Sequence, residues 1–157
     1  MIYKGVDLKW IIPHIYILSD PGSIIYVISP WIDTEIRFSI TWCSEPNNFN
    51  LSEIASKFNK RNIRTVFIFS KEEENNPINA KSIETIRKQN FEFHFVKRLH
   101  AKSIVGQRLM YIGSANLTYS GINLNAEAVT IEKVDSQENS LRELIGGNEL
   151  WRILKAK

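Results

Sequence analysis

The fold is decided by the stretch Arg98–Glu127, which reads RLHAKSIVGQRLMYIGSANLTYSGINLNAE. Two apolar-rich runs, 101–105 and 109–112, flank the polar tripeptide 106–108. Short runs of this kind, joined by a few polar residues that include a glycine, are typical of a β-hairpin. The second strand would end at Gly113, where a glycine permits a tight exit and a close approach of the backbone to a ligand. This stretch therefore predicts two antiparallel strands that bring the chain back to where it entered.

Five side chains of this stretch could form a phosphate site: His100, Lys102, Ser114, Asn116 and Glu127. Because His100 and Lys102 are two residues apart, their side chains would leave the same face of a strand. An imidazole can attack or donate a proton, and an ammonium keeps its charge at neutral pH. A hydroxyl and an amide can donate to non-bridging oxygens, and a carboxylate can hold an imidazole in one tautomer. A His-x-Lys pair alone is more often solvent-facing, but the other three residues favour catalysis.

The order of these residues resembles the HKD motif of the phospholipase D superfamily. His100-x-Lys102 is followed by Gly-Ser-x-Asn at 113–116, and the segment 29–33 (Ser-Pro-Trp-Ile-Asp) resembles the opening of many members. The likeness extends over about residues 8–132. The family usually places an Asp four residues beyond the Lys, whereas Gly and Gln occupy positions 106 and 107 here. The resemblance implies that this Asp is a structural and electrostatic support, so its absence bears on the strength of catalysis.

The resemblance also implies a double displacement at a composite site. The chain carries one half of the HKD pair, and twofold symmetry in a homodimer would supply the second half. His100 of one subunit would attack and form a phosphohistidine, while His100 of the other would protonate the leaving group and then activate water. Lys102, Ser114 and Asn116 would hold the phosphoryl oxygens, and Glu127 would orient an imidazole. This scheme requires no metal and no other cofactor.

Composition narrows the choice of partners. The chain has 157 residues, which suits a single domain, 1–157, with a full core. A net charge of +3 is compatible with nucleic acid.

We interpret Trp31, Arg98 and Arg108 as substrate-binding residues that stack on bases or contact phosphates. The leading hypothesis is an endonuclease, with DNA favoured over RNA. A lipid phosphodiesterase and a catalytically weak nucleic-acid-binding module are the alternatives.

The cysteine count and the hydropathy pattern restrict the class of protein. Cys43 is the only cysteine, which excludes an intramolecular disulfide and a cysteine-based metal site. The first residues do not read as a secretory signal, and no apolar run is long enough to cross a bilayer. We therefore expect an intracellular, cytoplasmic protein without stable membrane association.

Alternation of strands and helices predicts an α/β sandwich, with a mixed β-sheet flanked by helices on both faces. The resemblance implies the same phospholipase D-like fold. The predicted strands are 24–29, 35–43, 64–70, 91–96, 101–105, 109–112 and 125–132. The predicted helices are 7–19, 50–62, 77–89 and 138–154, the last with a break near 146–147. His14 and His94 are interpreted as structural residues.

Overall fold

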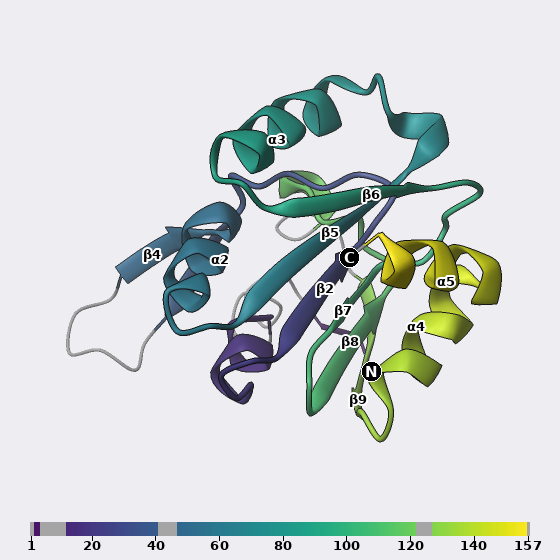
Figure 1. Cartoon of the computed structure of the whole chain (residues 1–157). Coiled ribbons are helices and arrows are strands. Elements are labelled where there is room, and N and C mark those ends of the chain that lie inside the picture. The colour runs from purple at the N-terminus through teal and green to yellow at the C-terminus, as the bar shows by residue number, and fades with distance from the viewer. Residues whose placement is uncertain (1, 4–11, 41–46, 122–126, 157) are drawn as a thin grey trace.

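A seven-stranded sheet crosses the middle of the molecule (Figure 1). The computed structural model describes residues 2–3, 12–40, 47–121 and 127–156. The strands of this sheet are, in spatial order, β1 (Ile2–Tyr3), β9 (Glu127–Lys133), β8 (Leu109–Gly113), β7 (Ser103–Val105), β2 (Ile24–Ile28), β5 (Arg64–Ser70) and β6 (Glu92–Val96). Strands β2, β5 and β6 run parallel, and the other pairings are antiparallel. The predicted mixed sheet is therefore confirmed.

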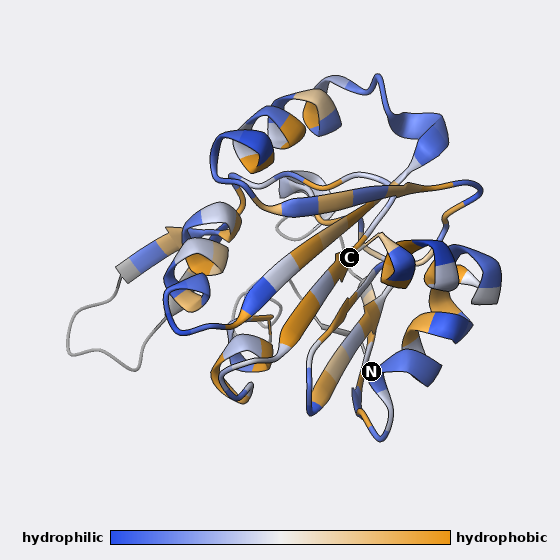
Figure 2. Ribbon diagram, viewed as in Figure 1, coloured by the Kyte–Doolittle hydropathy of each residue, from blue (hydrophilic) through white to orange (hydrophobic). Residues whose placement is uncertain are grey.

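Helices cover both faces of this sheet. Helices α2 (Leu51–Asn59) and α3 (Pro77–Lys88) and the helical residues 12–17 pack on one face, and α4 (Gln137–Ile145) and α5 (Gly147–Lys155) pack on the other (Figure 1). Successive strand residues point to opposite faces. Parallel strands that are covered on both sides therefore read as continuous apolar runs. Figure 2 shows β2 and β5 as hydrophobic for most of their length, and the predicted α/β sandwich is confirmed.

Local capping explains the helix boundaries. The side chain of Asn50 accepts a hydrogen bond from the backbone N of Glu53 at 2.8 Å, which stabilises the first turn of α2. Asn76 caps α3, and Pro77 occupies its first position. Gly146 has a φ of +86° and separates α4 from α5, as glycine readily does in this left-handed region. The break predicted near 146–147 is thus confirmed.

Two predicted elements need correction, and two short elements were not predicted. Of the helix predicted over 7–19, residues 12–17 are helical, and 7–11 lie outside the described residues. The strand predicted over 35–43 is β3 (Arg37–Ile40), with 41–43 outside the described residues. It pairs with β4 (Asn47–Asn50), a segment whose asparagines favour a polar loop. Pairing with β3 overrides that preference. A short 3₁₀ helix, Lys71–Glu73, lies in the charged loop after β5.

The strands place the predicted motif at one end of the sheet. Strands β2, β5, β6 and β8 end there, and β7 and β9 begin there. The chain passes from β2 to β5 and β6 on one side, then returns to β7 on the other side of β2. In α/β sheets, such a reversal of strand order opens a crevice beyond the carboxyl ends of the strands. The fold therefore places its topological switch point beside the motif.

Candidate active site

His100 and Lys102 lie in the segment that leads into β7. The predicted strand 101–105 is corrected in its first two residues, because the pairing with β2 reaches only to Ser103. Lys102 nevertheless keeps one bond across the hairpin, since its carbonyl accepts from the N of Gly113 at 2.9 Å. Its Nζ donates to the carbonyl of His100 at 3.0 Å. His100 is exposed and Lys102 is half-buried. The imidazole and the ammonium thus belong to one short, accessible segment.

Ser114 ties the second half of the motif to β9. Its backbone N donates to the carbonyl of Ala128 at 3.1 Å, and its Oγ accepts from the N of Ala128 at 3.1 Å. Glu127 immediately precedes Ala128 and is the first residue of β9. Its side chain lies outside the described part of the chain, so the predicted contact between Glu127 and His100 remains a prediction.

The absence of a side chain at Gly113 is required by the packing of its neighbour Tyr111. A Cβ at position 113 would lie 2.2 Å from the Oη and 2.6 Å from the Cζ of Tyr111. Tyr111 is fully buried in the core cluster on the α2 and α3 face. The backbone of Gly113 does not adopt the left-handed conformation. The role of Gly113 within the fold is therefore steric, and the close approach of its backbone to a ligand stays a prediction.

Asn116 is held beside the carboxyl end of β2 by Ser29. The Ser29 hydroxyl lies 2.8 Å from the carbonyl of Trp31 and 3.4 Å from Oδ1 of Asn116. It can donate its single proton to one of these oxygens at a time. It also accepts from the N of Leu117 at 3.3 Å, and Ile32 forms a parallel bridge with Leu117. Ser29 is fully buried and so couples the loop that carries Trp31 to the Gly-Ser-x-Asn turn.

Asn79, on α3, clamps the same loop from the other side. This side chain is fully buried, and its Nδ2 donates to the carbonyls of Pro30 at 2.9 Å and Glu73 at 3.0 Å. Its Oδ1 accepts from the N of Ile32 at 3.0 Å. The half-buried Trp31 therefore lies between Pro30 and Ile32, whose backbones are both bonded to the Asn79 side chain. The sequence did not point to Asn79, because an asparagine within an amphipathic helix is more often exposed.

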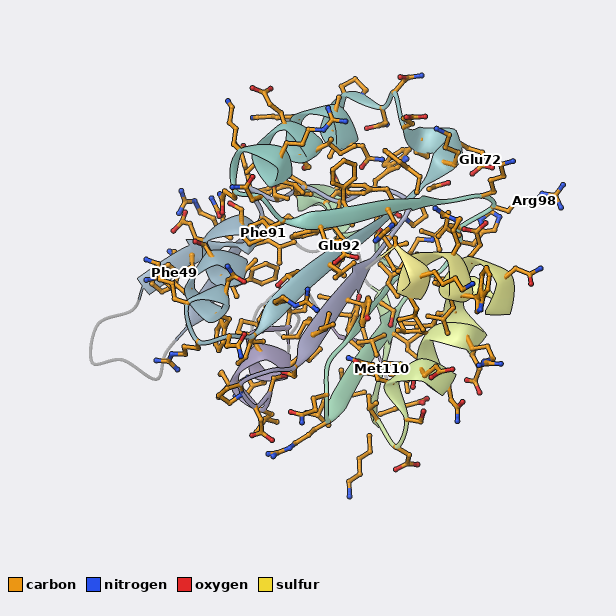
Figure 3. All side chains as sticks on the ribbon, viewed as in Figure 1. Phe49, Glu72, Phe91, Glu92, Arg98 and Met110 are labelled. Carbon is orange, nitrogen blue, oxygen red and sulfur yellow. The ribbon has the colours of Figure 1, made fainter. Side chains whose placement is uncertain are left out.

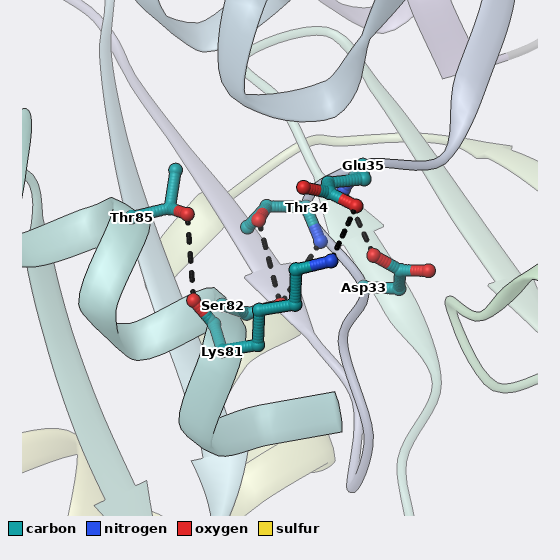
Figure 4. A network of polar contacts seen from close by, with 6 residues as sticks. All are labelled: Asp33, Thr34, Glu35, Lys81, Ser82 and Thr85. Carbon is teal, nitrogen blue, oxygen red and sulfur yellow. Dashed lines mark hydrogen bonds and ion pairs between the residues drawn. The ribbon is translucent and has the colours of Figure 1, made fainter. Parts of the chain in front are cut away.

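A second set of polar contacts continues this clamp along α3 (Figure 4). Oγ of the buried Ser82 accepts from the N of Thr34 at 3.1 Å. At the surface, Nζ of Lys81 lies 2.9 Å from Oε2 of Glu35. The loop after β2 is thus attached to α3 at three successive points, from Pro30 to Glu35.

The turn that precedes His100 is fixed by Glu72. Both carboxylate oxygens of Glu72 accept from the backbone N of Arg98, at 3.1 and 3.0 Å. Oγ of Ser70 donates to the same carboxylate at 2.8 Å. The bond from Ser70, and after it those from backbone amides, hold the pKa of Glu72 below its ordinary value. The guanidinium of Arg98 is exposed beside this turn and remains a predicted substrate contact.

Arg108 lies outside this cluster, and its role as a substrate-binding residue stays a prediction. It lies in the hairpin loop, at the opposite end of β7 and β8 from Lys102, roughly 15 Å away along the strand. Its guanidinium pairs with the carboxylate of Asp20 at 2.7 Å. Oε1 of Gln107 accepts from the N of Asp20 at 2.8 Å. The region where the family usually has an Asp therefore stabilises a turn far from His100.

Three further features of the described residues concern possible metal-binding groups, membrane-spanning helices and the surroundings of His94. Within the described ranges, no group of three or more His, Cys, Asp or Glu side chains is arranged to hold a metal ion. The helices of those ranges include none with the length and apolar character to cross a membrane. His94 lies in the middle of β6 with its Nε2 2.7 Å from Oε1 of Glu92. That contact fits the structural role inferred for it.

Comparison with known proteins assigns the architecture. A family model described as "Cardiolipin synthase, PLD-like domain" matches residues 5–144. Nuc from Salmonella typhimurium, described as a phospholipase D family member, is similar with a TM-score of 0.67 and 13% identity, over 92% of this chain and 86% of Nuc. NucT from Helicobacter pylori gives a TM-score of 0.63 and 13% identity, over 99% and 94% of the two chains.

A third similar structure is TrmBL2, an archaeal chromatin protein whose structure shows a novel mode of DNA binding. It has a TM-score of 0.53 and 13% identity, over 97% of this chain and 52% of TrmBL2. No curated protein matches the chain in sequence. At these identities the structural likenesses show a shared fold.

Proposed function

Since the chain belongs to the phospholipase D superfamily, we propose that it is a metal-independent phosphodiesterase that cleaves nucleic acid through a phosphohistidine. The observation that carries this proposal is that the His-x-Lys segment and the Gly-Ser-x-Asn turn lie together at the switch point of the sheet. Lys102 and Gly113 are joined by a backbone hydrogen bond, and Ser29 joins β2 to Asn116. Nζ of Lys102 donates to the carbonyl of His100, whose side chain is exposed, and Ser114 and Asn116 follow Gly113 in the chain.

In the first step of the proposed reaction, an unprotonated imidazole of His100 attacks phosphorus. A nitrogen–phosphorus bond forms, and the bond from phosphorus to the leaving oxygen breaks. A second imidazole gives its proton to that oxygen. In the second step this imidazole takes a proton from water, and the resulting hydroxide displaces the first imidazole from phosphorus. Lys102, Ser114 and Asn116 donate to the non-bridging oxygens, where negative charge increases in the transition state.

The second imidazole comes from His100 of another copy of the chain. A single histidine cannot both attack phosphorus and protonate the leaving group in one step, and the chain has one such motif. Exposure of His100 leaves it accessible to a partner subunit. In a twofold dimer the same surface meets its copy, so two identical histidines face one phosphate.

Nucleic acid, with DNA ahead of RNA, is the proposed substrate. Lys97 and Arg98, three and two residues before His100, are exposed and can contact neighbouring phosphates. The fold is shared with TrmBL2, a protein described by its DNA binding. A lipid substrate would need an apolar approach to the site, for which Trp31, Leu109 and Met110 are the candidates. Met110 is instead buried, in the core cluster on the α4 and α5 face.

The test is cleavage in EDTA with three substrates: plasmid DNA, a single-stranded oligonucleotide and phosphatidylcholine vesicles. The wild type is expected to cleave nucleic acid and not lipid, and His100→Ala is expected to lose at least about 1,000-fold in rate because the nucleophile is gone. The matched control is His14→Ala, which removes an exposed histidine from the helical residues 12–17. Full activity of His100→Ala, or an absolute requirement for Mg²⁺, would contradict the proposal.

A further inference from the structure

The backbone just before His100 has an unusual conformation. Strand β6 ends at Val96, and Arg98 has a φ of +56°. Few residues other than glycine adopt this left-handed conformation, and they do so where surrounding contacts hold them. Leu99, the next residue, is only 3% exposed and packs in the cluster on the α4 and α5 face. The chain therefore turns sharply at Arg98, is anchored at Leu99 and then presents His100.

Glu72 supplies the contact that holds this turn. Its two carboxylate oxygens accept from one amide, the N of Arg98. Glu72 follows β5 and Arg98 follows β6, and these neighbouring parallel strands are in register at Ser70 and Val96. Figure 3 shows Glu72 and Arg98 close together beyond the ends of these strands. Oγ of Ser70 donates to the same carboxylate and orients it. The carboxylate thus bridges the ends of two strands.

We propose that Glu72 is a positioning residue for His100: its carboxylate fixes the left-handed turn at Arg98 and so sets where the imidazole stands. The inference rests on the proposed function, because His100 is the nucleophile assigned there. It adds a residue outside the motif, on a different strand end. Glu72 does not need to touch the substrate. It acts through the backbone of Arg98 and the buried side chain of Leu99.

Two variants and one matched control separate positioning from a general effect of charge. Glu72→Ala removes both acceptors, whereas Glu72→Gln keeps the shape and one carbonyl oxygen. Glu73→Gln removes the same charge from the adjacent residue, whose side chain makes no contact with Arg98 among those seen in the described residues. Circular dichroism establishes whether each variant is folded. If Glu72→Ala does not fold, the isosteric Glu72→Gln provides the test.

The kinetic readout is kcat measured apart from KM, with a DNA oligonucleotide. Since a displacement of about 1 Å can cost 100-fold in rate, Glu72→Ala is expected to lower kcat by about 100-fold and Glu72→Gln by about 10-fold. KM should stay within about twofold, because Glu72 holds the nucleophile and not the substrate. Glu73→Gln should match the wild type. Equal kcat values for Glu72→Ala and Glu73→Gln would overturn the proposal.

An NMR readout keeps this inference separate from the proposed function. The backbone amide of Arg98 should exchange with solvent faster, and the ring signals of His100 should move, in both Glu72 variants but not in Glu73→Gln. If wild type cleaves nothing and these signals move, the proposed function fails while the positioning of His100 by Glu72 stands. If the His100 signals are the same in Glu72→Ala and wild type, the positioning role is wrong, whatever the activity.

Discussion

Asn79→Ala is the substitution whose effect the structure allows us to estimate most directly. The Asn79 side chain makes three hydrogen bonds, to the carbonyls of Pro30 and Glu73 and from the N of Ile32. At roughly 1 kcal/mol for each bond, their loss should lower the free energy of unfolding by about 3 kcal/mol. For a chain of this size, that corresponds to a fall of about 10 °C in Tm. Because the same loop is coupled to Asn116 through Ser29, kcat/KM should fall as well.

Urea denaturation followed by circular dichroism measures the first effect. The control is Asn75→Ala, which removes an exposed asparagine just before the same helix and should change stability by less than about 0.5 kcal/mol. Asn79→Asp is a more severe test of these contacts, because it places a carboxylate oxygen against the carbonyls of Pro30 and Glu73. Burial there raises the pKa of the introduced carboxyl, so this variant should lose stability as pH rises above the ordinary carboxyl pKa. Equal stability of Asn79→Ala and Asn75→Ala would refute the clamp.

Three further predictions concern Gly113, Trp31 and Glu72. Gly113→Ala should destabilise the protein by about 1–3 kcal/mol in a thermal melt, because its Cβ would overlap Tyr111, and adding Tyr111→Phe should recover part of that loss by removing the Oη. Trp31→Ala should weaken binding of a single-stranded oligonucleotide about 10-fold through lost stacking, measured by fluorescence anisotropy, whereas Trp151→Ala on α5, where Trp151 is 60% exposed, should not. The pKa of the Glu72 carboxyl lies below its ordinary value, so the stability that this carboxylate contributes is complete at a pH above the ordinary carboxyl pKa. That stability is lost as the pH falls through the lowered pKa of Glu72. The backbone amide signal of Arg98 should therefore shift in this acidic range in wild type and stay fixed in Glu72→Gln.

The elements that sequence predicts well are those whose local pattern and tertiary role agree. The run 24–28 is apolar throughout because β2 is covered on both faces, and the apolar run 66–69 within β5 has the same cause. Asn50 and Asn76 mark helix starts through bonds made within one turn. The sequence also places the His-x-Lys segment beside the Gly-Ser-x-Asn turn. These two segments flank a hairpin, and the register of β7 and β8 follows from the short loop between the two strands.

What sequence could not show depends on contacts between distant residues. Arg108 resembles a phosphate ligand in the sequence, but Asp20, 88 residues away, binds its guanidinium. Glu72 belongs to a charged loop that reads as solvated surface, yet it holds an amide 26 residues later. Strand β4 exists because β3 is available to pair with it, against the low strand propensity of asparagine. In each case the deciding partner is brought close only by the folded sheet.

The requirement for two copies of His100 can be tested through the stoichiometry of mixed subunits. If both imidazoles act on one phosphate, a dimer of one wild-type and one His100→Ala subunit is inactive, because either the nucleophile or the acid is missing. When the two proteins are unfolded together and refolded, activity should fall with the square of the wild-type fraction. With one quarter wild type, about one sixteenth of the activity should remain rather than about one quarter. Co-refolding with His14→Ala, whose substitution lies outside the motif, should leave activity unchanged, and a linear decline with His100→Ala would show that each subunit works alone.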